Sequence, residues 1–226
     1  MKRLLTSMML ILAPAMLAHA QDDPEYRMEI GAGVGLGGYL GDFNGSFTKD
    51  LEPMASIVGR YVINPHMALK MGVGLAKMKG SSADVMTYYP DYADAPYTFD
   101  NKLYDVCLTY EYNFWPYGTG RDYRGAKRFT PFVTGGIGAT YADTADKGKF
   151  TFNIPIGLGA KYKLSERVNL ALEWALHLSQ SDELDGVKDP YYVQSSGLFK
   201  NTDCYTTLQL TLTYSFMAKC ATCNKE

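Results

Sequence analysis

The sequence predicts an all-β protein, an eight-stranded antiparallel up-and-down barrel that crosses a membrane through its strands. Eight stretches alternate between apolar and polar side chains, which is the period of a strand with one face toward lipid and the other toward a polar interior. The connections between them alternate between short and long. The chain also carries 18 Tyr and 22 Gly in 226 residues, and this suits aromatic belts at both membrane interfaces and a crowded inner wall.

The first four stretches place aliphatic or aromatic side chains on one face and small or charged side chains on the other. In the first, Ile30 and Val34 oppose Glu29 and several glycines. The fourth is the most regular, because every second residue from Tyr104 to Phe114 is apolar. These alternations predict strands over Arg27–Gly37, Pro53–Ile63, Met67–Lys77 and Tyr104–Phe114.

The second half of the chain repeats the pattern. Glycines interrupt the fifth stretch without shifting its phase, and the seventh opposes Leu170 and Trp174 to Glu173 and His177. The eighth ends on the aromatic Phe216, as a barrel-closing strand commonly does. These alternations predict strands over Phe129–Tyr141, Phe152–Tyr162, Val168–Leu178 and Thr207–Phe216.

The lengths of the connections predict which end of each strand faces which side of the membrane. Long polar connections cover residues 38–52, 78–103 and 180–204, with an intermediate one at 142–149. Tight turns lie at Asn64-Pro65 and at residues 164–166. With the N-terminus in the periplasm, the long connections face the outside. Residues 115–127 are an exception, since they are long where a short periplasmic turn is expected.

The N-terminus has the order of a secretory signal peptide. Lys2 and Arg3 precede an apolar run, and Ala18-His19-Ala20 precedes Gln21. The run is short and contains Pro14, which argues against a transmembrane helix. We therefore expect a signal peptide over 1–20, the barrel over 21–216 and a periplasmic tail over 217–226.

The polar face carries enough charge to predict a network inside a narrow lumen. Its members are Glu29, Arg60, Lys70, Asp105, Glu111, Lys161, Glu173 and His177. Such charges must pair, because an isolated buried charge costs several kcal/mol. A soluble lipocalin-like barrel has the same period but turns its apolar face inward around a ligand. The membrane barrel is favoured because the apolar face ends in aromatic residues, as membrane girdles do.

The sequence offers little chemistry. A net charge of −2 without a basic cluster argues against nucleic-acid binding, and no Gly-x-Ser-x-Gly, His-Glu-x-x-His or Walker sequence occurs. His177 and Ser179 share a strand face, but no partner carboxylate or oxyanion hole can be named for a lipase-like site. The acidic long connections lack calcium-loop spacing. We expect no enzyme, no metal, no cofactor and no small-molecule substrate.

The glycines of the first strand have an interpretation of their own. The run GAGVGLGG, from Gly31 to Gly38, is itself a strand and does not join a strand to a helix, so it is no dinucleotide loop. We expect its alternate glycines to make room for bulky charged side chains across the lumen.

The four cysteines fall into two groups. Cys107 points into the lumen and Cys204 lies at the outer rim, while Cys220 and Cys223 follow the last strand on the periplasmic side. The last two have three alternatives: a bridge to each other, a metal site or a link to a cysteine of a partner. Two ligands are too few for zinc, and the thioredoxin-like helix of a redox Cys-x-x-Cys is missing. A local bridge or an intermolecular link remains.

Four segments, followed by a Cys-x-x-Cys tail, resemble the PorG-like outer-membrane β-barrel proteins of the Bacteroidetes over essentially the whole mature chain. They are YLGDFN (Tyr39–Asn44), TPFVTGGIGATY (Thr130–Tyr141), FNIPIGLGAKYKLSERVNLALEWALHLSQSDELDGV (Phe152–Val187) and NTDCYTTLQLTLTYSF (Asn201–Phe216). Cys204-Tyr205 departs from the aromatic pair expected there.

The resemblance implies a non-enzymatic protein of a Gram-negative, Bacteroidetes-type outer membrane. Its partners would be membrane lipid and the periplasmic ring of the type IX protein secretion machinery, made of a lipoprotein and partner subunits. The basic turn with Arg121, Arg124, Lys127 and Arg128 is the expected docking site, together with the tail. The alternative is a surface receptor or adhesin that binds through residues 81–101 and 180–202.

Overall fold

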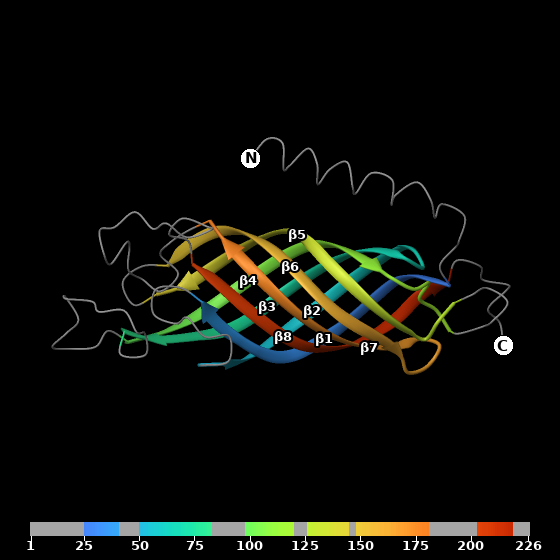
Figure 1. Ribbon diagram of the computed structural model, residues 1–226, viewed down its shortest axis with the longest axis horizontal. Coiled ribbons are helices and arrows are strands. Elements are labelled where there is room, and N and C mark those ends of the chain that lie inside the picture. The colour runs from blue at the N-terminus through green and yellow to red at the C-terminus, as the bar shows by residue number, and fades with distance from the viewer. Residues whose placement is uncertain are drawn as a thin grey trace, which may run out of the picture.

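Eight antiparallel strands close into a single barrel (Figure 1). The computed structural model describes residues 25–40, 50–82, 98–119, 126–144, 148–180 and 203–218. The strands are β1 (Tyr26–Leu40), β2 (Glu52–Asn64), β3 (Met67–Ser81), β4 (Thr98–Asn113), β5 (Phe129–Asp143), β6 (Lys149–Lys163), β7 (Val168–Ser179) and β8 (Cys204–Ala218). Each pairs with its neighbour in sequence, and β1 pairs with β8 to close the wall. Within the described residues, no helix has the length and apolarity needed to cross a membrane.

The predicted fold class is confirmed, and each predicted stretch overlaps one observed strand. The observed strands are longer than the predicted ones mainly at the end of the barrel that carries the long connections. There β4 begins at Thr98 and β1 continues to Leu40. There the outward-facing side chains of Lys77 and Lys102 lie opposite each other on β3 and β4. At the other end β8 continues to Ala218, two residues into the segment expected to be tail, and Met217 adopts a φ of 59°.

The apolar face of the barrel points outward. Ile137 is 68% exposed and Val34 is 66% exposed, whereas the buried side chains are mostly polar or charged. A water-soluble barrel does not present such a band, so the lipocalin-like alternative is wrong. Aromatic side chains flank the band on both sides, with Tyr61 and Tyr162 near the short turns and Tyr104 and Phe150 near the long connections.

The short turns gather at one end of the barrel, at the right in Figure 1, where β1 begins and β8 ends. Residues 65–66 join β2 to β3, and 164–167 join β6 to β7. The long segment between β4 and β5 folds back on itself, because the N–H of Lys127 donates to the Pro116 carbonyl and that of Tyr117 to the Pro65 carbonyl. This segment therefore forms part of the turn end.

The glycines of β1 have a different role from the one predicted. A Cβ on Gly31 would overlap the Leu212 carbonyl oxygen of β8, and one on Gly35 would overlap the main chain at Leu208. At Gly31 and Gly35 the limiting neighbour is therefore the backbone of the adjacent strand. At Gly33 and Gly38 it is an uncharged side chain, Thr211 or Leu51, and not a charged side chain across the lumen. Glycine permits the close approach of β1 and β8 where the barrel closes.

Candidate functional site

Four charged side chains form a network of ion pairs in the lumen on the side of the short turns. We call this set the turn-side cluster: Glu29 on β1, Arg60 on β2, Glu111 on β4 and Lys161 on β6. Arg60 donates to Glu29, its Nε lies 3.3 Å from Glu111 Oε1, and Lys161 donates to Glu111. Two cations and two anions balance. Since Glu111 is 0% exposed and Arg60 is 2% exposed, these side chains close the cross-section.

A further ion pair lies nearer the middle of the lumen. Lys70 on β3 donates to the carboxylate of Glu173 on β7, and both side chains are buried. Thr134 donates to Glu173 Oε1 at 3.5 Å. Six of the eight lumen residues predicted from the sequence are thus charged groups drawn into ion pairs across the barrel.

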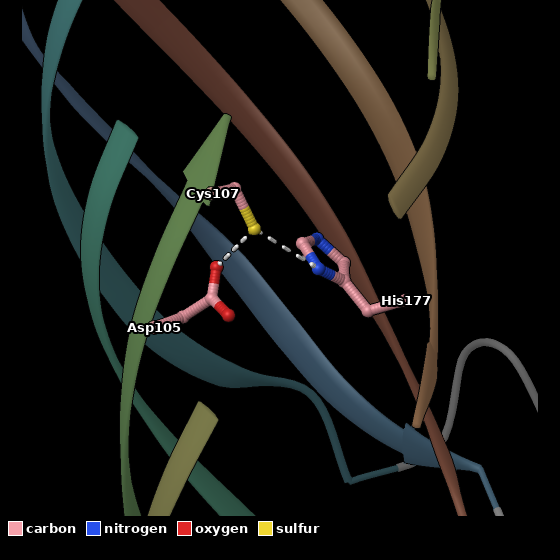
Figure 2. Close-up of side chains that lie close together, drawn as sticks. All are labelled: Asp105, Cys107 and His177. Atoms are coloured by element: carbon pink, nitrogen blue, oxygen red, sulfur yellow. Dashed lines mark hydrogen bonds between the residues drawn. The ribbon is translucent and has the colours of Figure 1, made fainter. Parts of the chain in front are cut away.

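The remaining two predicted lumen residues meet a thiol on the side of the long connections. Figure 2 shows this loop-side trio: Asp105 and Cys107 on β4 and His177 on β7. The Cys107 thiol donates to Asp105 Oδ2 at 2.8 Å and lies 3.9 Å from His177 Nδ1. Cys107 and His177 are buried and Asp105 is half-buried.

Neighbouring polar side chains fix the orientation of the trio. Asp105 Oδ1 accepts from the Tyr205 hydroxyl at 2.7 Å and from Asn153 Nδ2 at 2.8 Å. The His177 ring stacks on Tyr205 with 4.3 Å between ring centres, and its Nε2 lies 3.3 Å from Thr207 Oγ1. The carboxylate and the ring are therefore held from behind, and Asp105 Oδ2 and His177 Nδ1 are turned toward the thiol.

A cavity of about 60 Å³ lies beside the trio. Asp105, Cys107 and His177 line it, as do Lys70 and Glu173. A buried apolar cluster lies beyond it toward the long connections and contains Tyr39, Ala76, Met78, Phe99, Leu103, Ala142 and Tyr205. The cavity thus lies between an apolar layer and the ion pairs, and it is large enough for ordered water.

The turn end carries the other predicted site. Lys127 and Arg128 are exposed, while Arg121 and Arg124 lie outside the described residues. Lys127 Nζ lies 4.7 Å from the centre of the Trp115 ring, and Arg128 Nε donates to the Thr119 carbonyl at 2.9 Å. Arg128 therefore holds its own turn in place, which leaves Lys127 as the described cation best placed to contact a partner.

The turn packs down into the barrel through Tyr117. Its hydroxyl donates to Asn169 Oδ1 at 3.0 Å, and Lys161 Nζ lies 5.2 Å from its ring centre. Burial raises the pKa of the Tyr117 hydroxyl, so the group stays protonated and donates. On the rim, Glu25 accepts from the Thr119 amide at 3.1 Å. These contacts tie the turn to the start of β1.

Two predicted features fall on residues that the structure does not describe. Cys220 and Cys223 lie outside the described residues, as do the segments 83–97 and 181–202 of the long connections. The lipase-like pairing is not built: His177 directs its ring nitrogens to Cys107 and Thr207, and Ser179 Oγ lies 3.2 Å from Thr151 Oγ1.

Sequence reasoning missed the loop-side trio. The spacing of Asp105 and Cys107 places both on one strand face, so the sequence alone could have predicted that these two residues lie together. His177 comes from a strand on the other side of the lumen, and only the closed barrel brings it to the thiol.

Comparison with known proteins identifies the family. The family described as "Domain of unknown function (DUF6089)" matches residues 2–225. The chain belongs to this family. No curated protein matches the chain significantly.

Several solved structures are similar to this DUF6089 chain. The crystal structure of Neisserial surface protein A (NspA) is 15% identical, with a TM-score of 0.50 over 84% of this chain and 97% of that one. Ail, the attachment invasion locus protein of Yersinia pestis, is 10% identical over 84% of this chain and 99% of its own, with a TM-score of 0.47. The N-terminal β-barrel domain of Pseudomonas aeruginosa OprF is 13% identical over 84% and 99%, with a TM-score of 0.44. The similarity to NspA supports the fold alone, a closed antiparallel β-barrel.

Proposed function

We propose that this barrel lies in the outer membrane of a Gram-negative, Bacteroidetes-type cell and anchors the periplasmic ring of the type IX protein secretion machinery. The observation that carries the proposal is the division of the molecule into a closed lumen and a cation-bearing turn end. The turn-side cluster fills the cross-section with Arg60 and Glu111 almost fully buried, which favours an anchor over a pore. The resemblance to PorG-like proteins supplies the identity of the ring.

The exposed apolar side chains on the outer surface of the barrel support membrane lipid as a partner. Ile137, Val34 and Phe152 are each more than half exposed on the outside of the barrel, and burying such a surface in hydrocarbon is strongly favourable. The aromatic residues at both margins suit the headgroup region. The turn end then faces the periplasm, where a ring subunit is within reach.

The docking surface consists of the turn between β4 and β5 with the tail behind it. Lys127 is exposed, and its ammonium group lies over the Trp115 ring in a cation–π contact. Arg121 and Arg124 belong to the same turn. A ring subunit that docks here would present carboxylates, because charge complementarity sets the register of such contacts.

The test reverses the charge of the turn between β4 and β5 but keeps the hydrogen bond that holds its conformation. Arg121→Glu, Arg124→Glu and Lys127→Glu are combined, and Arg128 is kept because it bonds to the Thr119 carbonyl. The matched control combines Lys77→Glu, Lys102→Glu and Lys149→Glu, which reverse three positive charges at the opposite end of the barrel. The barrel is purified from its own host, and the ring lipoprotein and its partner subunit are quantified by mass spectrometry.

We expect the turn variant to lose both ring subunits and the control to retain them. Retention of the ring by the turn variant, with a folded barrel in both cases, would contradict docking at this surface. Loss in both variants would point to a general dependence on surface charge and would also count against the proposal.

The tail thiols have a separate test. Cys220→Ser and Cys223→Ser are made singly and together, and membranes are separated on non-reducing gels. An intermolecular link gives a slower band that contains a ring subunit and disappears in the variants. A local bridge gives no such band, and docking then depends on the turn alone.

A further inference from the structure

We propose that Asp105, Cys107 and His177 bind a zinc ion in the lumen of the barrel. Their ligand atoms all lie within 4.8 Å of one another, and they come from two strands on different sides of the lumen (Figure 2). Thiolate, imidazole and carboxylate are the three side-chain ligands that zinc takes in proteins. The proposal depends on lumen residues only, so it stands apart from the docking of a secretion ring.

Two of the three distances within the trio bracket those of a tetrahedral ion, and the third pair of ligand atoms lies within 4.8 Å. Usual zinc–ligand bond lengths place the ligand atoms of a tetrahedral site about 3.3–3.6 Å from one another. Cys107 Sγ lies 2.8 Å from Asp105 Oδ2 and 3.9 Å from His177 Nδ1, which brackets that range. Small side-chain rotations bring both pairs to the required separation without moving a strand.

The groups behind the ligands complete the site. A ligating His normally donates its other ring N–H to an oxygen, and His177 Nε2 lies 3.3 Å from Thr207 Oγ1. A ligating carboxylate is normally hydrogen-bonded through its second oxygen, and Asp105 Oδ1 accepts from Tyr205, Asn153 and Thr140. The atoms left to face the thiol are Oδ2 and Nδ1, the pair that the site needs.

The charge balance also favours a divalent ion. Lys70 and Glu173 neutralise each other beside the cavity, so within the part of the chain that the structure describes Asp105 has hydrogen bonds but no ion pair. When the ion binds, the Cys107 thiol loses its proton to water in the cavity, and one thiolate and one carboxylate neutralise the two positive charges. Buried charge is then fully compensated on this side of the lumen.

The cavity supplies the fourth ligand. Its volume of about 60 Å³ exceeds the roughly 10–15 Å³ that one water needs. Three protein ligands and a water form the open arrangement of zinc sites. The thiolate selects zinc or another borderline metal over magnesium or calcium, which prefer oxygen ligands alone.

A cysteine-nucleophile site is the rival interpretation, and the hydrogen bonds oppose it. In such a site the carboxylate orients the His and the His takes the proton of the nucleophile. Here Asp105 accepts directly from the Cys107 thiol, and a carboxylate in that position disfavours the thiolate. The arrangement is that of three convergent ligands.

The experiment uses a barrel that keeps Cys107 as its only thiol. Cys204→Ser, Cys220→Ser and Cys223→Ser remove the other three cysteines, including the pair in the tail. The purified, detergent-solubilised chain is titrated with Co²⁺, whose thiolate charge-transfer absorption reports a Co–S bond, and then with Zn²⁺ in competition. We expect one Co²⁺ per chain, displaced by one Zn²⁺, with release of one proton.

Matched variants in the same background locate the ligands. Cys107→Ser should remove the charge-transfer band, and His177→Gln and Asp105→Asn should each weaken binding by at least 100-fold. Thr207→Val, which changes only the group behind the ring, should weaken binding by about 10–100-fold. Heat-modifiable migration on gels shows that each variant is folded.

Two results would overturn the proposal. One is a folded single-thiol barrel without a charge-transfer band at saturating Co²⁺. The other is a band that survives His177→Gln with unchanged affinity, because the metal would then be held elsewhere.

Discussion

The two halves of the lumen accommodate buried charged side chains in different ways. On the turn side, Arg60 and Lys161 are matched by Glu29 and Glu111, and these side chains occupy the cross-section. On the loop side, Asp105 has hydrogen bonds but no cation in contact among the described residues, and a cavity of about 60 Å³ lies next to it. One half contains a network of ion pairs, whereas the other keeps space and convergent ligands.

Because of this difference, we expect the turn-side cluster to contribute mainly to stability and the loop-side trio mainly to ligand binding. A closed charge network gains nothing from an added ion, because each member already has a partner. A carboxylate, a thiol and an imidazole beside a cavity do gain from one. We therefore expect substitutions in the turn-side cluster to affect unfolding most, and substitutions around the loop-side trio to affect ligand binding more than unfolding.

The largest effect is expected from Glu111→Gln. Glu111 contacts both Arg60 and Lys161, so its loss leaves two buried cations with one anion. Removing one partner of a buried pair destabilises by about 3–5 kcal/mol. The free energy of unfolding can be measured by urea titration in detergent or lipid, followed by the fluorescence of Trp115 and Trp174.

The control for this variant is Glu52→Gln. Glu52 accepts from Lys79 at 2.7 Å at the loop end, where Lys79 is exposed to solvent. Exposed pairs contribute little, so the free energy of unfolding should hardly change. Equal losses in the two variants would show that burial of the turn-side cluster does not set its importance.

A second variant asks whether the loss comes from charge imbalance. Glu111→Gln with Lys161→Met removes one anion and one cation and leaves Arg60 paired with Glu29. We expect this double variant to recover about 0.5–3 kcal/mol relative to the sum of the single losses. Additive losses, measured by the same titration, would mean that packing and not charge balance holds this half together.

The third prediction compares two glycines of the wall. A Cβ on Gly31 meets the Leu212 carbonyl, whereas one on Gly72, which lines the cavity, meets nothing within 4 Å. Gly31→Ala should cost about 1–3 kcal/mol through overpacking, and Gly72→Ala should be neutral or stabilising. A loss of equal size at Gly72 would contradict the description of the loop side as the half with free space.

The sequence predicted the wall of the barrel better than its contents. Alternation depends on neighbours along one strand, so Ile30, Val34 and Glu29 reveal their faces without knowledge of the partner strand. The inward side of all eight charged or His residues could be inferred in the same way. Which of them would meet depended on the registers of the strands and on the tilt that closes the barrel.

The loop-side trio and the glycines of β1 show why contacts between strands could not be predicted from the sequence. Cys107 and His177 are 70 residues apart, and no local pattern links them. The role of Gly31 depends on the approach of β8 at the closing seam, which has no signature in β1 itself. The turn between β4 and β5 was expected to be an exposed basic loop, and its contact with Asn169 through Tyr117 depends on the completed barrel.

The smallest effect is expected from Tyr205→Phe on the loop side. The substitution removes the hydroxyl that donates to Asp105 Oδ1 at 2.7 Å but keeps the ring that stacks on His177. Asp105 Oδ1 still accepts from Asn153 and Thr140, so the loss in unfolding free energy should be about 1.5 kcal/mol, the lower end for a hydrogen bond to a charged group. Tyr61→Phe, on the outer surface of the barrel, is the control and should show no measurable loss. If Tyr205→Phe destabilised the barrel as much as Glu111→Gln, the loop-side trio would be a structural network like the turn-side cluster, and the contrast between the two halves would fail.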